Sequence, residues 1–134
     1  MNQTLKKCLV LLQLKEHCLV NKLPEYLVRL NGESIYSSAN HLYELNCNFG
    51  PNEIQIELRN KDDFDTTVVN GEVTHDLAIE VISIISDKID LTYQLKPYAK
   101  INGEIKNVEI KNSFYIGKNS TLSFPIICKC ESHI

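Results

Sequence analysis

The residues best suited to chemistry lie in one acidic segment, residues 60–76. Oxygen-bearing side chains cluster there: Asn60, Asp62, Asp63, Asp65 and Asp76. Carboxylates this close repel one another unless water screens them or a cation binds them. Ca²⁺ takes about six to eight oxygen ligands from Asp, Asn and backbone carbonyl groups, so the segment is a candidate calcium site. The alternative interpretation is a solvated acidic loop, with Lys61 beside the carboxylates.

The segment does not follow the EF-hand pattern. Val68 stands where that pattern requires a glycine, and Thr74 stands in place of its terminal glutamate. Two further side chains complete the candidate site as ligand-binding residues. Phe64 is the aromatic residue of the segment, and His75 directly precedes Asp76.

The sequence favours a protein that is not an enzyme. No Gly-x-Ser-x-Gly elbow accompanies the His75–Asp76 pair. A nucleophilic Cys47 or Cys128 acting with His41 or His75 has no local pattern to support it. The carboxylate pairs that could imitate a glycosidase dyad are Asp62 with Asp65 and Glu57 with Glu80. A small hydrolase therefore stays a third-ranked alternative.

The chain has five cysteines, and the odd number without a secretory leader argues against a disulfide framework. We therefore expect most of them to be buried thiols that act as small hydrophobic side chains. Cys128, Cys130 and His133 could offer soft ligands to zinc, with a fourth ligand from Cys8, Cys18 or His17. The simpler expectation is a final strand that carries two thiols.

Composition indicates a single soluble globular domain over residues 1–134. The net charge is -3 and there is no basic patch, which excludes typical nucleic-acid binding. No stretch approaches the roughly 18 apolar residues of a membrane span. The apolar run near the start ends at Gln13 without a small-residue cleavage site, so we expect synthesis in a reducing cytoplasm without a signal peptide.

Hydrophobic residues alternate with polar ones along most of the chain, which predicts β-strands with one buried face. Residues 26–30, 43–49, 54–59 and 122–126 show this period. Asn-Gly-Glu occurs at 31–33, 70–72 and 102–104, and Asn-Gly suits a tight hairpin turn. The alternation slips at Val81–Ile82, which indicates a bulge or a strand buried on both faces. Residues 9–14 fit a helix or a strand, and we favour a strand.

These patterns predict an all-β fold, an antiparallel two-sheet sandwich or jelly roll of about eight to nine strands. An up-and-down barrel is the alternative. Sandwich edges carry unpaired amides that can accept another strand. The apolar flanking segments, about residues 1–20 and 125–134, are therefore candidates for self-association or strand exchange between copies. Otherwise they close the sandwich on itself.

Residues 52–62, the acidic segment and residues 76–84 together resemble the core of calcium-dependent, xylan-binding-type carbohydrate-binding modules, which are small β-jelly rolls. The same layout is familiar from small virion-associated proteins of tailed phages. Their closing Tyr-x-Gly-x-Asn-x-Thr-x-x-x-Phe stretch is similar to residues 115–124. The resemblance covers roughly residues 27–126.

The resemblance implies a Ca²⁺ site at Asn60, Asp62, Asp63, Asp65 and Asp76. It also implies a non-enzymatic virion accessory protein, a head decoration protein or tail adaptor that binds virion proteins and host glycans. A free-standing calcium-dependent carbohydrate-binding module is the alternative. The chain departs from the modules at Lys61, where they often have an acid, at Leu77, where they commonly have an arginine, and in having no Trp.

Overall fold

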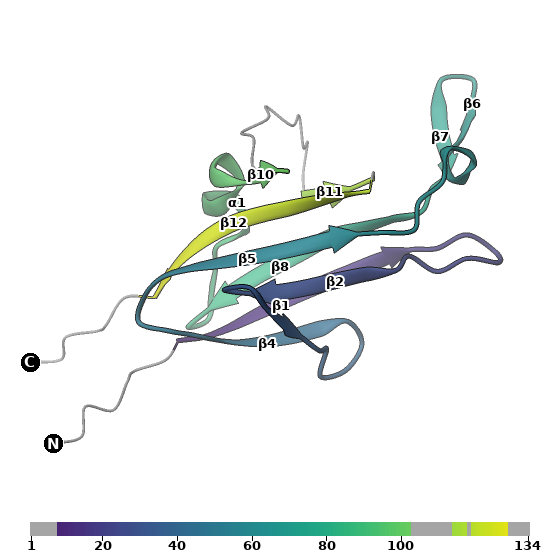
Figure 1. Ribbon diagram of the computed structural model, residues 1–134. Helices are drawn as coiled ribbons and strands as arrows, with labels where there is room; N and C mark the ends of the chain where they lie inside the picture. The colour runs from purple at the N-terminus through teal and green to yellow at the C-terminus, as the bar shows by residue number, and fades with distance from the viewer. Residues whose placement is uncertain (1–7, 103–113, 118, 129–134) are drawn as a thin grey trace, which may run out of the picture.

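The computed structural model describes residues 8–102, 114–117 and 119–128. Two antiparallel sheets stack on each other with their strands running in similar directions (Figure 1). This confirms the predicted all-β, two-sheet sandwich. In the described residues, no helix is long and apolar enough to cross a membrane.

The first sheet has the strand order β11-β8-β1-β4, with β9 paired to β8. Its strands are β1 (Cys8–His17), β4 (Leu42–Cys47), β8 (Ala78–Ser86), β9 (Ile89–Asp90) and β11 (Phe114–Ile116). The second sheet has the order β10-β12-β5-β2-β3. Its strands are β2 (Tyr26–Leu30), β3 (Glu33–Ile35), β5 (Gly50–Leu58), β10 (Lys100–Ile101) and β12 (Ser120–Cys128).

The remaining elements belong to neither sheet and connect strands along the chain. The 3₁₀ turn η1 (Asp63–Asp65) leads into a separate hairpin of β6 (Thr67–Val69) and β7 (Glu72–His75). Helix α1 (Thr92–Leu95) and the 3₁₀ turn η2 (Lys96–Tyr98) lie before β10. The structure has more strands than the sequence predicts, because strands of two or three residues such as β3, β9 and β10 are too short to show a period.

The core confirms the predicted alternation. Ile54, Ile56 and Leu58 of β5 are buried while their neighbours reach solvent. They meet buried side chains of the opposite sheet, among them Leu12 and Leu45. Each fully buried aliphatic side chain of this size contributes roughly 1.5–3 kcal/mol relative to an exposed one. The sandwich is therefore held mainly by its inner faces.

The irregularity in residues 77–85 is a β-bulge. Strand β1 pairs Gln13 with Ser83 and then Leu14 with Val81, so Ile82 is the extra residue. Ile82 is exposed, whereas Val81 and Ile84 are buried. The bulge lets a nearly all-apolar strand present its residues to one core without a break in the sheet.

Asn-Gly turns close two hairpins, as the sequence predicts. Asn31–Gly32 connects β2 to β3, and Asn70–Gly71 connects β6 to β7, with all four residues at positive φ. Asn102 also has a positive φ, and Gly103 lies outside the described residues. Asn40–His41 forms a further turn with positive φ at both positions, which the sequence pattern does not reveal.

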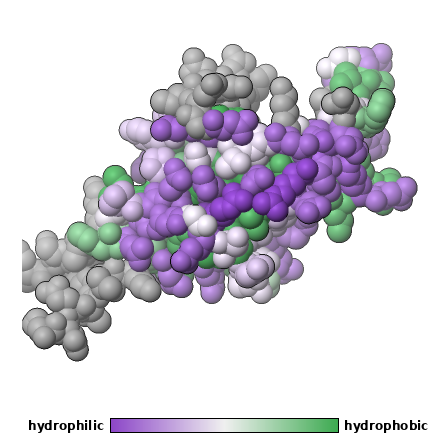
Figure 2. Space-filling model, viewed as in Figure 1, coloured by the Kyte–Doolittle hydropathy of each residue, from purple (hydrophilic) through white to green (hydrophobic). Residues whose placement is uncertain are grey.

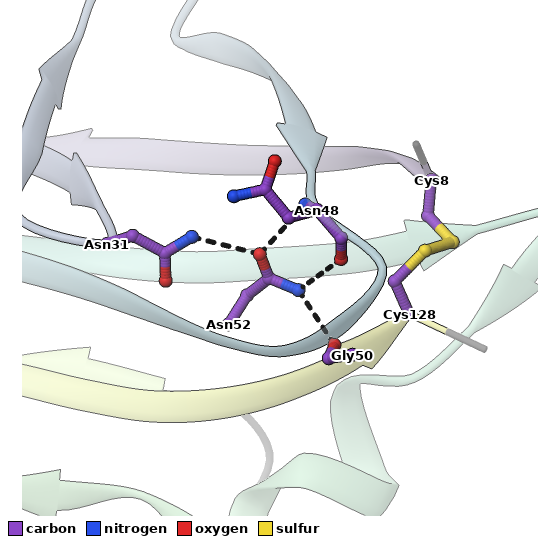
Figure 3. Close-up of a disulfide and its surroundings, with 6 residues drawn as sticks. All are labelled: Cys8, Asn31, Asn48, Gly50, Asn52 and Cys128. Carbon is purple, nitrogen blue, oxygen red and sulfur yellow. Dashed lines mark hydrogen bonds between the residues drawn. A yellow bond between two sulfur atoms is a disulfide. The ribbon is translucent and has the colours of Figure 1, made fainter. Parts of the chain in front are cut away.

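The two sheets are joined at one end by a disulfide between Cys8 and Cys128 (Figure 3). These residues begin β1 and end β12. Their Cα atoms are 5.7 Å apart, although their sequence separation is 120. The prediction of unpaired thiols is wrong for this pair, because the sandwich brings together strand ends whose proximity no local spacing reveals.

The other cysteines fit the prediction in part. Cys47 is a buried free thiol on β4, directly opposite Cys8, and burial raises its pKa to about 11. Cys18 is free but exposed. Cys130 and His133, which the zinc hypothesis needs, lie outside the described residues, and the disulfide already occupies Cys128.

A buried amide supports the same end of the sandwich. Asn52 accepts hydrogen bonds from the side chain of Asn31 and the backbone N–H of Asn48, both 2.9 Å away. It donates to the carbonyl oxygens of Asn48 and Gly50 (Figure 3). These contacts fix the tight connection between β4 and β5, so that a buried polar side chain is fully used.

Candidate functional site

The acidic segment forms a hairpin that projects from one end of the sandwich (Figure 1). We call residues 63–75, which comprise η1, β6 and β7, the arm. The arm's strands pair with each other in a two-stranded sheet. Two clusters of charged side chains lie at its base, and each is built around a lysine.

The first cluster joins the arm to the loop between β1 and β2. Lys22 Nζ donates to Asp62 Oδ2 at 2.9 Å and to Asp65 Oδ2 at 2.6 Å. The backbone N–H of Asp62 also donates to Asp65 Oδ2, at 2.7 Å. That hydrogen bond, followed by the Lys22 ammonium, holds the pKa of Asp65 below its ordinary value. The same carboxylates raise the pKa of Lys22.

The second cluster is centred on Asp76, where the arm returns to the sheet. Its Oδ1 accepts hydrogen bonds from the Lys61 ammonium and, at 2.7 Å, from Thr66 Oγ1. The Tyr115 hydroxyl donates to the other carboxylate oxygen. The side chains of Lys61 and Asp76 are only 11% and 13% exposed. This is a largely buried ion pair in which both carboxylate oxygens are bonded.

Burial and hydrogen bonding act in opposite directions on Asp76. Burial raises the pKa of the carboxyl group, but the hydrogen bonds from Lys61, Tyr115 and Thr66 outweigh it, so the pKa lies below its ordinary value. Burial and the Asp76 carboxylate both raise the pKa of Tyr115. At neutral pH the pair is therefore an ionised carboxylate beside a protonated phenol.

Two asparagines complete the base of the arm. Asn60 Nδ2 donates to the carbonyl oxygen of Leu23, and Asn60 Oδ1 accepts from the backbone N–H of Glu25. Asn119 bonds both backbone groups of Lys61, at 2.8 Å each. Each asparagine therefore fixes one side of the chain that leads into the arm.

Gly117 packs closely against Tyr115 in this region. A Cβ atom at that position would lie 3.0 Å from the Tyr115 ring. The Tyr-x-Gly-x-Asn run at 115–119 thus places a phenol and an amide on the arm's base. The resemblance includes these residues but assigns them no role, and the structure shows them bonded to Asp76 and Lys61. Lys22 had no local signal, since it lies about forty residues from its partners.

The structure brings the predicted calcium ligands together only in part. Asp62 and Asp65 share one cation, the Lys22 ammonium. Asp76 pairs instead with Lys61. The Asn60 side chain bonds backbone groups of residues 23 and 25. The side chain of Asp63 lies outside the described part of the chain. The described residues contain no group of three or more His, Cys, Asp or Glu side chains that could hold a metal ion.

The two predicted ligand-binding residues belong to the arm. Phe64 is 93% exposed on η1, and His75 is exposed at the end of β7. Figure 2 shows apolar surface gathered on this projecting hairpin. The arm therefore presents apolar side chains at its surface and keeps its carboxylate–lysine pairs at its base.

The other carboxylate pair from the sequence is divided between the sheets. Glu57 on β5 accepts from Arg29 at 2.7 Å and from Arg59 at 3.1 Å, and these bonds lower its pKa. Glu80 on β8 is bonded to His17 at 2.8 Å. Each carboxylate has its own basic partner on its own face, so the pair does not form a dyad.

A chain of four polar side chains includes His41. His41 Nε2 lies 2.7 Å from Glu16, His41 Nδ1 lies 3.1 Å from the Tyr26 hydroxyl, and Tyr43 donates to that hydroxyl at 3.0 Å. The order carboxylate, imidazole, hydroxyl suits activation of a nucleophile. However, burial raises the pKa of Tyr26, which opposes formation of a phenolate. These contacts link β1, β2 and the turn before β4.

The fold and the charged clusters define the class of the molecule: a two-sheet β-sandwich with a projecting hairpin fixed by lysine–aspartate pairs. Comparison of the chain with protein-family models, curated proteins and solved structures finds no match. A sandwich of this kind supports many unrelated functions, so function has to be argued from the arm and its base.

Proposed function

We propose that the chain is a non-enzymatic accessory protein of a phage virion, a head decoration protein or tail adaptor that binds other virion proteins. The observation that carries this proposal is the arm. It places Phe64 and Val68, 93% and 58% exposed, on a hairpin that projects from the sandwich. Exposed apolar side chains gathered on one projection mark a surface that is covered by a partner.

The base of the arm supports a binding role because it makes the arm rigid in advance. An isolated two-stranded hairpin is marginally stable in water. Lys22 ties Asp65 of the arm to the loop between β1 and β2, and Lys61 pairs with Asp76 across the base of the arm, where the chain enters and leaves it. A hairpin that is ordered before it meets its partner loses less conformational entropy on binding.

The disulfide supports a location outside a reducing compartment. Bonds such as Cys8–Cys128 persist in oxidising environments, which include virion surfaces, and are rare in the cytosol. A phage protein made in the cytoplasm meets such an environment after lysis. The disulfide fits a virion component and a secreted module equally, so it is the resemblance to virion-associated proteins that favours the virion component.

A calcium-dependent, glycan-binding role is the second proposal, and one observation favours it. Asp62 and Asp65 already converge on a single cation, the Lys22 ammonium. Ca²⁺ would have to displace that ammonium and recruit further oxygen ligands, because it takes about six to eight. The arm's Phe64 would then offer an aromatic surface to a sugar ring.

The test of the first proposal is the composition of purified particles of the phage that encodes the chain. We expect the chain to co-sediment with particles at a fixed ratio to the major capsid or tail protein. Its recovery only in the soluble fraction of the lysate would contradict the proposal. A glycan array probed with and without chelator tests the second proposal, which fails if no sugar is retained under either condition.

A further inference from the structure

The same chain has a largely apolar hollow that could receive an apolar projection such as the arm. A hollow of about 330 Å³ lies between η2, β10 and β12. Its lining is largely apolar, with two charged side chains: Pro97, Tyr98, Phe124 and Pro125, together with Ser123, Lys100 and Glu53. We call it the Tyr98 hollow. Its volume is at the lower end of the roughly 300–1,000 Å³ of ligand pockets.

The hollow and the arm cannot meet within one molecule. In the β5–β12 pair, Pro125 lies opposite Glu53, whereas the arm follows the other end of β5, where Leu58 lies opposite Ser120. Five residues of extended strand separate Glu53 from Leu58, or roughly 17 Å at 3.4 Å per residue. The arm then projects away from the sheets (Figure 1).

We propose that the arm of one molecule docks in the Tyr98 hollow of a second copy, so that the chain self-associates head to tail. The apolar side chains of the arm are exposed, and so are Pro97, Tyr98 and Pro125 around the hollow, whereas Phe124 at its floor is buried in the core. Tyr98, at the hollow's rim, is 61% exposed. An apolar projection and a matching hollow elsewhere on the same molecule form a heterologous contact between copies.

Charge also favours this occupant. The arm, residues 63–75, contains no lysine or arginine and carries an exposed Glu72. The lining of the hollow carries one cation, Lys100, and one carboxylate, Glu53, both exposed, so Glu72 of the incoming arm has its partner on the Lys100 side. An acidic arm is repelled by phosphate-rich surfaces, which disfavours a membrane or a nucleic acid as the partner. The inference names a second copy of the chain as the partner that covers the arm. Its test uses the purified protein alone, so it can fail or hold separately from the virion proposal.

A head-to-tail contact has a consequence that a symmetric dimer lacks. Each molecule keeps one free arm and one free hollow after pairing, so association continues to a ring or a filament. The average mass therefore rises with concentration beyond that of a dimer, unless a small ring closes. Two variants, each defective in a different half of the contact, restore one contact when they are mixed.

The experiment is sedimentation velocity on the full chain over a wide concentration series. Wild type should form species larger than a dimer. Val68→Asp on the arm and Tyr98→Asp in the hollow should each raise the dissociation constant at least about tenfold, because a buried carboxylate has no partner there. Tyr36→Asp, at an exposed aromatic residue outside both features, is the matched control and should behave as wild type.

An equimolar mixture of the Val68→Asp and Tyr98→Asp variants tests whether the contact joins an arm to a hollow. It should form a dimer and nothing larger, since only one intact arm meets one intact hollow. The proposal is overturned if wild type stays monomeric at every concentration, if either variant associates as wild type does, or if the mixture stays monomeric. Urea unfolding of each variant confirms that the substituted proteins are folded.

Discussion

The two ends of the sandwich are closed by different chemistry. At one end a disulfide, Cys8–Cys128, joins the sheets beside the buried Asn52. At the other end ion pairs made by Lys22 and Lys61 fix the arm. A reductant cleaves the disulfide but leaves the ion pairs intact. Acid protonates the aspartates of the ion pairs but leaves the disulfide intact. The comparison indicates that the two ends can be loosened separately.

Loss of the disulfide should have the largest effect. It closes a loop of 120 residues in the unfolded chain, which corresponds to about 4–5 kcal/mol of stability in the chain-entropy account. The double substitution Cys8→Ser with Cys128→Ser should lower the free energy of unfolding, measured in urea, by that order. Cys18→Ser, at an exposed free thiol, is the control and should change it little. Equal stability of wild type and the double variant would contradict the structure.

Removal of one charge from the buried Lys61–Asp76 pair should have the second-largest effect on stability. Asp76→Asn keeps the shape of the side chain but leaves the Lys61 ammonium buried beside a neutral group, at a cost of about 3 kcal/mol. Replacement of both partners, Asp76→Asn with Lys61→Met, should cost less than Asp76→Asn alone, because no unpaired charge is left and the amide oxygen at position 76 can still accept a hydrogen bond. Urea unfolding of both variants checks this order, and a greater loss in the double variant would refute it.

Acid should loosen the ionic end before the disulfide end. The folded-state pKa values of Asp65 and Asp76 are depressed, so their stabilisation is present above the unfolded value of about 3.9 and is lost as pH falls through the folded values. The protection factors of the Asp62 and Leu77 amides, the measured NMR exchange rates relative to the intrinsic rates at the same pH, should fall below about pH 4, with little change at Asn48. A simultaneous fall at all three amides would mean that the two ends are coupled.

The sequence predicts the sandwich well and its two ends poorly. Alternation along residues 54–59 and Asn-Gly at 70–71 are local patterns, and they report strands and a hairpin directly. The slip at Val81–Ile82 even locates the bulge. By contrast, the Cys8–Cys128 bond joins residues far apart in sequence, and only the finished topology places them together.

The same limit applies to the candidate site. The density of acidic residues in the sequence marks the segment, but it does not reveal which basic side chains pair with them. Lys22 lies in a different loop and has no pattern that connects it to Asp65. A count of carboxylates predicts that a cation is needed, yet it does not distinguish a metal ion from a lysine ammonium.

Calcium should have the smallest effect on stability in the wild-type protein. Lys22 already neutralises Asp62 and Asp65, so Ca²⁺ must compete with it. We expect a thermal shift in excess Ca²⁺ relative to chelator that is larger in Lys22→Met than in wild type. Lys88→Met, at an exposed lysine in the turn between β8 and β9, is the matched control. If wild type, Lys22→Met and Lys88→Met all show no shift, Asp62 and Asp65 have a purely structural role.

The central claim is that the lysine–aspartate pairs exist to hold the arm. Hydrogen–deuterium exchange of wild type and Asp76→Asn, read by peptide, tests it most directly. We expect faster exchange confined to residues 60–77, 115–117 and 119, with β1, β4, β5 and β12 protected as in wild type. Unchanged exchange in the arm, or equally faster exchange throughout the sandwich, would contradict it.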